Sequence, residues 1–376
     1  MAGLIAGHGG RDALGSGPML KVRAVISGTG SVIAPVRLPN EHFIDSDFRA
    51  ASGERIAKPT QKILEQFEAI TGIRERRYVS DDLVTSDIAA QAAAAALGSS
   101  KIDRETLDAI IVAHNFGDVR AGTVRSDLVP SLAARVKHKL GIRNPATAAW
   151  DLIFGCPGWL QGVIVSQAMI RAGDARRVMV IGAETLSRIT DPHDRDSLIY
   201  ADGAGATIIE AAETAAPVGI LAHTVRSDTG EQLDMLFMAR SNDPELIGDE
   251  IYLKMEGRKL YRYALETVAG AIRKCLEKAG VGIDQVAKIL LHQANEKMDT
   301  AIVKALYDLY DLPVPPDIMP MTISWLGNSS VATLPTLLDL ILQGRVGQHR
   351  IDSGDIIVFA SVGAGMHINA VVFRVP

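Results

Sequence analysis

The stretch Asp151-Leu-Ile-Phe-Gly-Cys-Pro-Gly158 decides the fold. Mainly apolar residues lead into its turn, and Gly155 and Gly158 permit that turn to be tight. Pro157 suits the first position of a helix, where its missing N–H costs little. This order predicts a buried strand that turns sharply into a helix, with Cys156 at the helix N-terminus.

Apolar runs rich in Val and Ile recur on both sides of this stretch, at residues 22–26, 109–113, 178–181, 206–209, 289–291, 356–360 and 370–373. Runs of this kind are typical of strands buried on both faces. Helical patterns alternate with them at residues 86–97, 257–279 and 331–342. The alternation predicts an α/β protein whose sheets are mostly parallel.

The order of these parts occurs twice along the chain. In the first half a strand ends at Gly155-Cys156, and a helix and the strand 178–181 follow. In the second half a strand is expected to end at Gly327-Asn328, followed by a helix and the strand 356–360. We therefore predict two similar α/β halves, residues 21–212 and 213–376. Residues 1–20 are expected to be a flexible extension or an expression remnant outside the fold.

The composition excludes several classes of protein. The chain has 376 residues and a net charge of −5, whereas general nucleic-acid binding needs a basic surface. The uncharged run 152–170 approaches the length of a membrane span, but its Gly, Pro and Gln residues favour a turn and a buried helix. Residues 1–18 lack the basic start and apolar block of a signal peptide. The two cysteines, Cys156 and Cys275, are too few for a disulfide framework, so we expect a reduced, cytoplasmic protein.

Cys156 is the candidate nucleophile. The positive end of a helix dipole favours the thiolate, which is the nucleophilic form of Cys. A buried structural Cys is the alternative, and the local pattern alone does not separate the two. Cys275 lies inside the predicted helix 257–279, away from any glycine turn, and is interpreted as a packing residue.

Two other polar residues follow apolar runs. His292 comes directly after the run 289–291, and Asn328 stands at a second strand-to-helix junction, where α/β proteins usually place their sites. Taken singly, His292 could equally be structural and Asn328 a helix N-cap. The glycines of Ser361-Val-Gly-Ala-Gly-Met366 would let backbone N–H groups reach an oxyanion. A similar glycine turn is expected at 202–206, and no His, Cys or Asp cluster has metal-ligand spacing.

Together these pieces resemble the β-ketoacyl-acyl carrier protein synthase III family of the thiolase superfamily, from about residue 21 to the end. The segments that carry the resemblance are, in order, Ser27-Gly-Thr-Gly-Ser31, Thr71-Gly-Ile-Arg-Glu-Arg-Arg77, the Cys156 turn, Asp191-Pro-His-Asp-Arg-Asp196 with Asp202-Gly-Ala-Gly-Ala206, His292-Gln-Ala-Asn295, and Gly327-Asn-Ser-Ser330 with the 361–366 turn. The resemblance implies a thiolase fold, in which two similar α/β halves form a five-layered α-β-α-β-α arrangement.

The resemblance also implies catalytic roles. Cys156 would take an acyl group from a starter acyl-CoA or acyl-carrier protein, which requires a thiolate. His292 and Asn328 would bind the thioester carbonyl of malonyl-acyl carrier protein while it loses CO2. Backbone N–H groups of Cys156 and Ala364 would form a second oxyanion hole. The product would be a β-ketoacyl thioester, and the reaction would need no cofactor or metal besides its thioester substrates.

Two other functions stay open at this point. An acyltransferase of the same fold would load Cys156 and pass the acyl group to an oxygen, nitrogen or sulfur acceptor without decarboxylation. A degenerate member would only complete the pocket of a partner. The presence of Asn328, and a C-terminal glycine turn without a second Cys, favour the condensing enzyme.

The substrate-binding positions that the resemblance implies are Arg195, Arg258, Tyr261, Ala294 and Val129. Family members usually carry a Trp and an Arg that hold the adenine of CoA, but this chain has Gln66 and Ile70. CoA binding is therefore altered or replaced by delivery from a carrier protein. Val129 stands where a bulky aromatic residue often closes the acyl pocket of the partner subunit, which implies a homodimer and a longer or branched starter. We expect a role in fatty acid or specialised polyketide-like lipid biosynthesis, for example of alkylresorcinols.

A basic patch is expected to dock the acidic carrier protein. The candidates are Arg262 and Lys297, together with Arg258 and Lys259, and Lys297 stands where the family often has a docking Arg. A solvated face of mixed charge is the alternative interpretation.

Overall fold

The first half of the chain forms a five-stranded sheet. In the computed structural model, which describes residues 20–376, its strands lie in the order β1 (Lys21–Ile33), β9 (Asp202–Thr214), β8 (Arg177–Thr185), β4 (Ala109–Ala113) and β7 (Ala148–Leu152). The central strands β4 and β8 are buried almost throughout, as their unbroken apolar runs predict. Residues 1–19, which make up most of the expected N-terminal extension, lie outside the described residues.

The second half repeats this topology in a four-stranded sheet. Its strands lie in the order β10 (Gly219–Ser227), β15 (His367–Arg374), β14 (Ile356–Gly363) and β13 (Val286–Leu291). By position in the sheet and along the chain, they correspond to β1, β9, β8 and β4. The described second half has no counterpart of β7.

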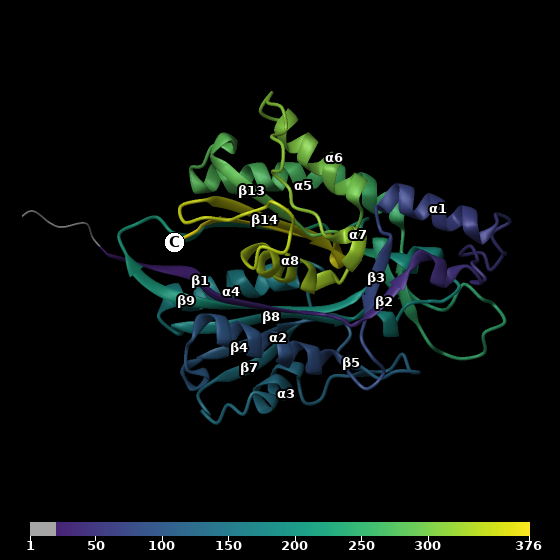
Figure 1. Ribbon diagram of the computed structural model, residues 1–376, viewed down its shortest axis with the longest axis horizontal. Coiled ribbons are helices and arrows are strands. Elements are labelled where there is room, and N and C mark those ends of the chain that lie inside the picture. Colours follow the sequence, from purple (N-terminus) through teal and green to yellow (C-terminus); the bar gives the residue numbers. More distant parts are fainter. Residues whose placement is uncertain (1–19) are drawn as a thin grey trace, which may run out of the picture.

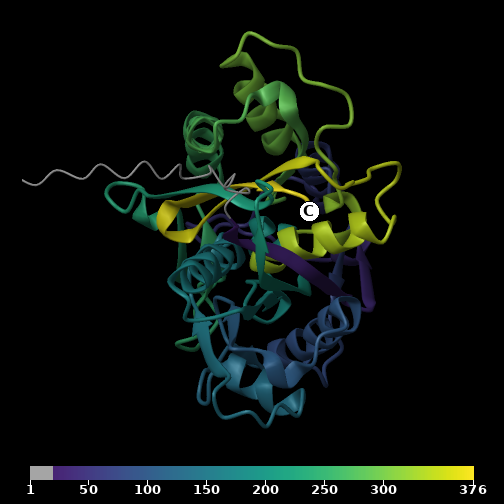
Figure 2. The same ribbon diagram turned by 90° about the vertical axis from the view of Figure 1, so that its left-hand side faces the viewer.

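Helices and sheets alternate in five layers (Figure 1). The outer helices α2 (Thr85–Ser100) and α3 (Leu132–Lys139) cover the first sheet, and α5 (Gly257–Ala279) and α6 (Glu296–Asp308) cover the second. Between the sheets lie α4 (Gly158–Ala172) and α8 (Thr333–Leu342), which contact strands of both. The view from the side shows the same stacking (Figure 2). The predicted five-layered α/β arrangement is confirmed.

The central layer explains why α4 and α8 are so apolar. Both helices need apolar side chains on two faces, because a sheet packs on each side. Trp159 of α4 is almost fully buried and lies edge-on to Phe359 of β14, with ring centroids 5.8 Å apart. This contact joins the helix behind Cys156 to the sheet of the other half.

Shorter elements complete the described fold, and those labelled in Figure 1 lie on its right-hand side. They are α1 (Thr60–Thr71), α7 (Ile323–Leu326) and three two-stranded sheets: β2 (Val36–Pro39) with β3 (Glu75–Tyr78), β5 (Asp118–Val119) with β6 (Ser126–Asp127), and β11 (Leu236–Ala239) with β12 (Tyr252–Met255). Across residues 20–376, no helix is both long and apolar enough to cross a membrane.

Three local predictions were wrong. The sheets are mixed rather than mostly parallel, since only β4 with β7, β4 with β8, and β13 with β14 pair in parallel. No strand ends at Gly327-Asn328, because the apolar run before it forms the short helix α7. A four-residue apolar run is ambiguous between strand and helix, and Pro320 cannot donate to a strand ladder.

The third error concerns residues 202–206, which were expected to form a glycine turn. They are the start of β9 and pair with both β1 and β8. Their small size serves packing instead, because a Cβ placed on Gly205 would lie 2.7 Å from the Thr336 nitrogen. Helix α8 can therefore approach the sheet closely.

Candidate active site

Cys156 lies in the turn that the sequence predicts. Strand β7 ends at Leu152, helix α4 begins at Gly158, and Gly155 has a φ of +62° that favours glycine. Cys156 is the second residue before the helix and is partly exposed, whereas Cys275 is buried inside α5. The turn leaves the Cys156 side chain at the carboxyl end of the first sheet.

The C-terminal glycine turn packs directly against the Cys156 turn. A Cβ on Gly155 would lie 2.7 Å from the Ala364 nitrogen, and one on Gly363 would lie 2.5 Å from the Cys156 nitrogen. Real Cβ atoms do not approach this closely, so glycine is required at both positions. The backbone N–H groups of Cys156 and Ala364, which the sequence predicts to form an oxyanion hole, therefore come from two turns in contact.

His292 directly follows β13, as predicted. Its backbone N–H donates to the Ala360 carbonyl of β14 over 2.9 Å, so the imidazole lies at the end of the strand that leads into the glycine turn. Burial lowers the pKa of His292 to about 4, and its Nδ1 has no hydrogen-bond partner within residues 20–376. The imidazole is therefore neutral at physiological pH.

Asn328 is buried and held on both sides by its backbone. Its N–H donates to the Ile199 carbonyl over 2.9 Å, and its carbonyl accepts from the Ala201 N–H over 2.8 Å. The side-chain Oδ1 accepts from the Ser330 N–H over 2.8 Å, a local bond between residues two apart, whereas the N-cap of the 3₁₀ turn Ser330–Ala332 is Ser329 rather than Asn328. With Oδ1 occupied, Nδ2 is the group that can donate to a substrate.

Three residues beside Cys156 were not identified from the sequence. The Ser330 hydroxyl donates to Cys156 Sγ over 3.3 Å, and Asn115 Nδ2 donates to Ser330 Oγ over 3.1 Å. Asn115 Nδ2 also donates to Glu184 Oε1 over 2.5 Å. Ser330 belongs to the Gly327-Asn-Ser-Ser330 segment, but nothing local marks Asn115 or Glu184, because they are linked to Cys156 only through Ser330.

The electrostatics of the site differ from the sequence prediction. Burial, followed by the neighbouring Glu184 carboxylate, raises the pKa of the Cys156 thiol to about 11, although the Ser330 hydroxyl opposes this rise. The helix dipole was expected to favour the thiolate, but burial has the larger effect and leaves Cys156 as a thiol at neutral pH in the unliganded site. Burial also raises the pKa of Glu184 to about 8.

Tyr200 is a further buried polar group of this region. Its backbone bridges to Asn328, its side chain packs in the apolar cluster around Ile199 and Ile323, and its hydroxyl has no partner among the described residues. No local sequence pattern marks it.

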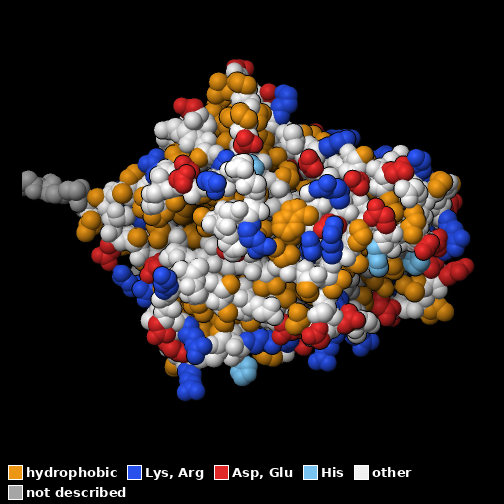
Figure 3. Space-filling view, in the orientation of Figure 1, with side chains coloured by type: hydrophobic (Ala, Val, Ile, Leu, Met, Phe, Trp, Pro, Cys, Tyr) orange, Lys and Arg blue, Asp and Glu red, His pale blue; other side chains and the backbone are white. Residues whose placement is uncertain are grey.

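The other predicted binding residues lie further from the centre. Arg195, Arg258, Arg262 and Lys297 are exposed, and Tyr261 and Ala294 are half-buried against the core of the second half. In the described part of the chain, no hydrogen bond or ion pair links any of them to the catalytic candidates. A Cβ on Gly257 would lie 3.7 Å from the Asp196 carboxylate. Arg195 and Arg258, the sequence neighbours of these two residues, therefore belong to segments in contact. On the face in Figure 3, acidic and basic side chains are interspersed.

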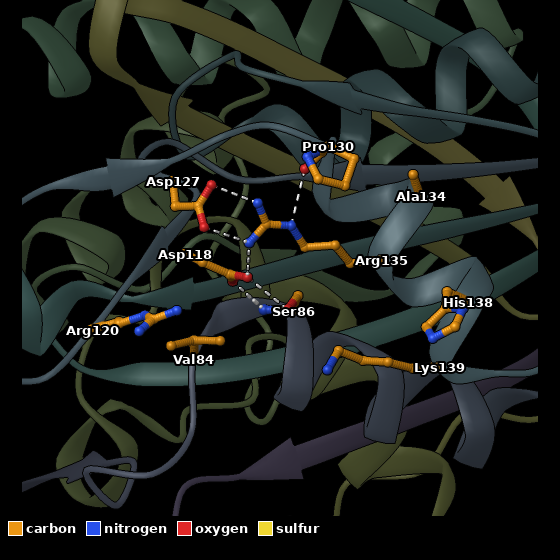
Figure 4. A pocket seen from close by; sticks show the side chains of 10 residues that line it. All are labelled: Val84, Ser86, Asp118, Arg120, Asp127, Pro130, Ala134, Arg135, His138 and Lys139. Atoms are coloured by element: carbon orange, nitrogen blue, oxygen red, sulfur yellow. Dashed lines mark hydrogen bonds and ion pairs between the residues drawn. The ribbon is translucent and has the colours of Figure 1, made fainter.

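Val129 lies on the surface with 86% of its area exposed. Beside it, Pro130 and Arg135 line a cavity of about 320 Å³ that contains none of the catalytic candidates (Figure 4). Arg135 donates to Asp118 over 2.7 Å and to Asp127 over 2.6 Å, and these bonds fix the loop that carries Val129.

Within residues 20–376, no group of three or more His, Cys, Asp or Glu side chains could hold a metal ion.

Two known family descriptions match this chain, one in each half. Residues 150–229 match the family described as 3-oxoacyl-[acyl-carrier-protein] synthase III, and residues 276–375 match the C-terminal part of that synthase. The beta-ketoacyl-[acyl-carrier-protein] synthase III of Cereibacter sphaeroides is 33% identical over 94% of this chain and 100% of its own length. That of Paracoccus denitrificans is 33% identical over 94% and 99%. The crystal structure of the synthase III from Pseudomonas aeruginosa superposes with a TM-score of 0.75 and 28% identity, over 94% of this chain and 98% of the other.

Proposed function

The chain belongs to the beta-ketoacyl-[acyl-carrier-protein] synthase III family of condensing enzymes, and we propose that it joins an acyl group carried on Cys156 to a malonyl thioester with loss of CO2. The contact between the Cys156 turn and the Ala364 turn is the observation that carries this proposal. It is accompanied by a neutral His292 and by an Asn328 whose Nδ2 makes no hydrogen bond within residues 20–376. Each half of the fold supplies part of the site.

The first step loads the enzyme. The Cys156 sulfur attacks the carbonyl carbon of a starter thioester, a new C–S bond forms, and the donor thiol leaves when the tetrahedral intermediate collapses. Backbone N–H groups of Cys156 and Ala364, which belong to two turns in contact, would donate to the carbonyl oxygen as it becomes negative. The thiol proton leaves Cys156 on attack and is taken up by the departing thiolate.

The second step makes the nucleophile. The malonyl carboxylate leaves as CO2, and its electrons form an enolate whose oxygen receives hydrogen bonds from His292 and Asn328 Nδ2. A neutral imidazole can donate from its remaining N–H without carrying a charge into a buried site. The carbanion then attacks the acyl-Cys156 carbonyl, and the C–S bond breaks to give a two-carbon-longer β-ketoacyl thioester. These steps use side chains and thioester substrates, without a cofactor.

The donor is proposed to be an acyl-carrier protein in preference to acyl-CoA. Helix α1 presents Gln66 and the half-exposed Ile70 at the predicted adenine site. Three carboxylates, Glu65, Glu68 and Glu296, and one basic residue, Arg74, line a neighbouring cavity of about 640 Å³. Of the three carboxylates, Glu65 alone forms an ion pair within residues 20–376, with Lys62. Carboxylates there would repel the phosphates of CoA. The exposed Arg258, Arg262 and Lys297 on α5 and α6 remain the proposed docking face for an acidic carrier protein.

A homodimer is proposed as the working form. Strand β7 is the partly exposed edge of the first sheet, and Ile153, which directly follows it, exposes 61% of its area. Val129 exposes 86% of its area and lies three residues before Leu132, whose N–H donates to Asp151 of β7. An unpaired edge and exposed apolar side chains are features that a second copy would cover. Val129 of one protomer would then close the acyl pocket of the other, where its small size admits a longer or branched starter for fatty acid or polyketide-like lipid synthesis.

Intact-protein mass spectrometry with a panel of acyl-CoAs and matched acyl-carrier proteins tests the loading step. We expect a mass gain of one acyl group, mapped to Cys156 and lost in Cys156→Ala, with carrier-bound donors faster than CoA donors. Loading that persists in Cys156→Ala would contradict the proposal. Faster loading from CoA would contradict the donor assignment alone.

A further inference from the structure

We propose that Ser330 is a fourth catalytic residue, whose hydroxyl stabilises the Cys156 thiolate, and that Asn115 and Glu184 hold it in position. The inference rests on the proposed role of Cys156 as nucleophile and deepens it. No charged base contacts the sulfur in the described residues, and His292 is neutral, so the thiolate must be favoured by neutral donors.

The contacts form a continuous line to the sulfur. Ser330 Oγ lies 3.3 Å from Cys156 Sγ, Asn115 Nδ2 lies 3.1 Å from Ser330 Oγ, and Glu184 Oε1 lies 2.5 Å from Asn115 Nδ2. Ser330 and Glu184 are almost fully buried, so water competes little for these bonds. The four residues come from different elements: the Cys156 turn, the 3₁₀ turn before α8, the segment after β4, and β8.

The direction of donation follows from the chemistry of each group. An amide NH₂ can only donate, so Asn115 Nδ2 occupies the acceptor side of Ser330 Oγ. The single hydroxyl hydrogen of Ser330 is then left to point at Cys156 Sγ, where a negative charge develops on reaction. Hydrogen bonds to charged groups are stronger than those to neutral ones, so this bond favours the thiolate over the thiol.

Glu184 acts through Asn115 and is a positioning residue. Its Oε1 accepts the second hydrogen of the Asn115 amide, which fixes the amide plane and so the bond to Ser330. Burial keeps this carboxyl protonated at neutral pH by raising its pKa to about 8. Below that pH the neutral carboxyl orients Asn115 without repelling the thiolate, and above it the carboxylate adds to the rise in the pKa of the Cys156 thiol.

The backbone of Ser330 supports the same assignment. Ser330 has a φ of +52°, in the left-handed region that residues other than glycine rarely adopt, and such strain is usually found at functional sites. Its N–H donates to Asn328 Oδ1 while its hydroxyl reaches Cys156. One strained residue therefore orients both the nucleophile and the enolate-binding amide.

Alkylation of Cys156 by iodoacetamide, mapped by peptide mass spectrometry and followed from about pH 6 to about pH 10, tests the inference without any acyl substrate. In Ser330→Ala and Ser330→Gly the rate at neutral pH should fall about 10-fold to 100-fold, and the rise with pH should move to higher pH. Two variants are needed because Gly relieves the backbone strain that Ala keeps. Asn115→Ala should lower the alkylation rate at neutral pH about threefold and move the rise with pH in the same direction.

The neighbouring Ser329→Ala is the matched control, because the Ser329 hydroxyl makes no bond to the four residues. Ser329→Ala should keep the wild-type pH dependence of Cys156 alkylation. Alkylation of the urea-unfolded proteins should be equal in all variants.

Folded Ser330→Ala and Ser330→Gly with unchanged profiles would overturn the inference. So would a loss of rate that is the same at every pH, since that result indicates obstruction rather than thiolate stabilisation. Failure of wild-type Cys156 to react at any pH would instead contradict its role as nucleophile, and with it the proposed function.

Discussion

Gly155 and Ala364 are in direct contact, so close that a Cβ on Gly155 would lie 2.7 Å from the Ala364 nitrogen and 2.8 Å from its oxygen. The two residues are more than half the chain apart and belong to different halves of the fold. Their contact joins the nucleophile turn to the C-terminal glycine turn, and it accounts for the requirement for glycine at position 155.

Gly155→Ala is expected to lower the free energy of unfolding by about 3 kcal/mol, because the Cβ adds a clash with Ala364 to the strain of a positive φ. Gly173→Ala is the matched control. Gly173 also has a positive φ, of +83°, but nothing lies within 4 Å of its Cβ position, so about 1 kcal/mol is expected. Urea denaturation measures both values, and equal losses would contradict the importance of the Gly155–Ala364 contact.

Asn328→Asp is expected to leave acyl loading intact and to slow malonyl decarboxylation about 100-fold. Asp keeps the oxygen that accepts from the Ser330 N–H but replaces the Nδ2 donor by a second acceptor. Loading is measured by intact mass and decarboxylation by CO2 release. An equal loss in both steps would mean that Asn328 supports the fold of the whole site rather than the enolate.

The pH dependence of decarboxylation tests the protonation state of His292. Since burial lowers its pKa to about 4, the neutral form persists down to that pH and is lost only below it. In a Cys156→Ala background, where the thiol does not titrate, the decarboxylation rate should vary less than about twofold from about pH 6 to about pH 8. A tenfold or larger fall towards about pH 6 would contradict a neutral, buried His292. His292→Ala should match Asn328→Asp, with acyl loading retained and decarboxylation slowed.

Glu184 makes folding stability depend on pH. Its folded-state pKa of about 8 lies above the ordinary value of 4.5, so the folded protein binds more protons than the unfolded one between these values. Its contribution is therefore present at low pH and is lost as the pH rises through this window. Relative to wild type, Glu184→Gln should gain about 3 kcal/mol in the free energy of unfolding between about pH 5 and about pH 8. A constant difference across this range would contradict burial of a protonated Glu184.

The larger elements of the fold could be predicted because their signals are local. The helix end at Gly280 and the buried strand Ala109–Ala113 coincide with the predicted ranges, since capping residues and continuous apolar runs mark them. The sheet order could not be predicted. Whether β9 runs antiparallel to β8 depends on tertiary packing, not on the composition of either strand.

The same distinction applies to the site. Cys156, His292 and Asn328 each follow a recognisable run or turn, which makes them candidates, and the order of all the segments along the chain then indicates their roles. Asn115 and Glu184 act only through contacts with residues far along the chain, and no local pattern distinguishes them from other polar residues. The ionisation of Cys156 was mispredicted because the helix dipole is a local property, whereas burial depends on the whole fold.

The central claim is tested most directly by adding malonyl-acyl carrier protein to enzyme already acylated on Cys156 and measuring CO2 and the product together. We predict one CO2 released for each β-ketoacyl product, which is two carbons longer than the loaded acyl group, with loss of the acyl mass from Cys156. Discharge of the acyl group to an acceptor without chain extension or CO2 would contradict the condensing role and would favour simple acyl transfer.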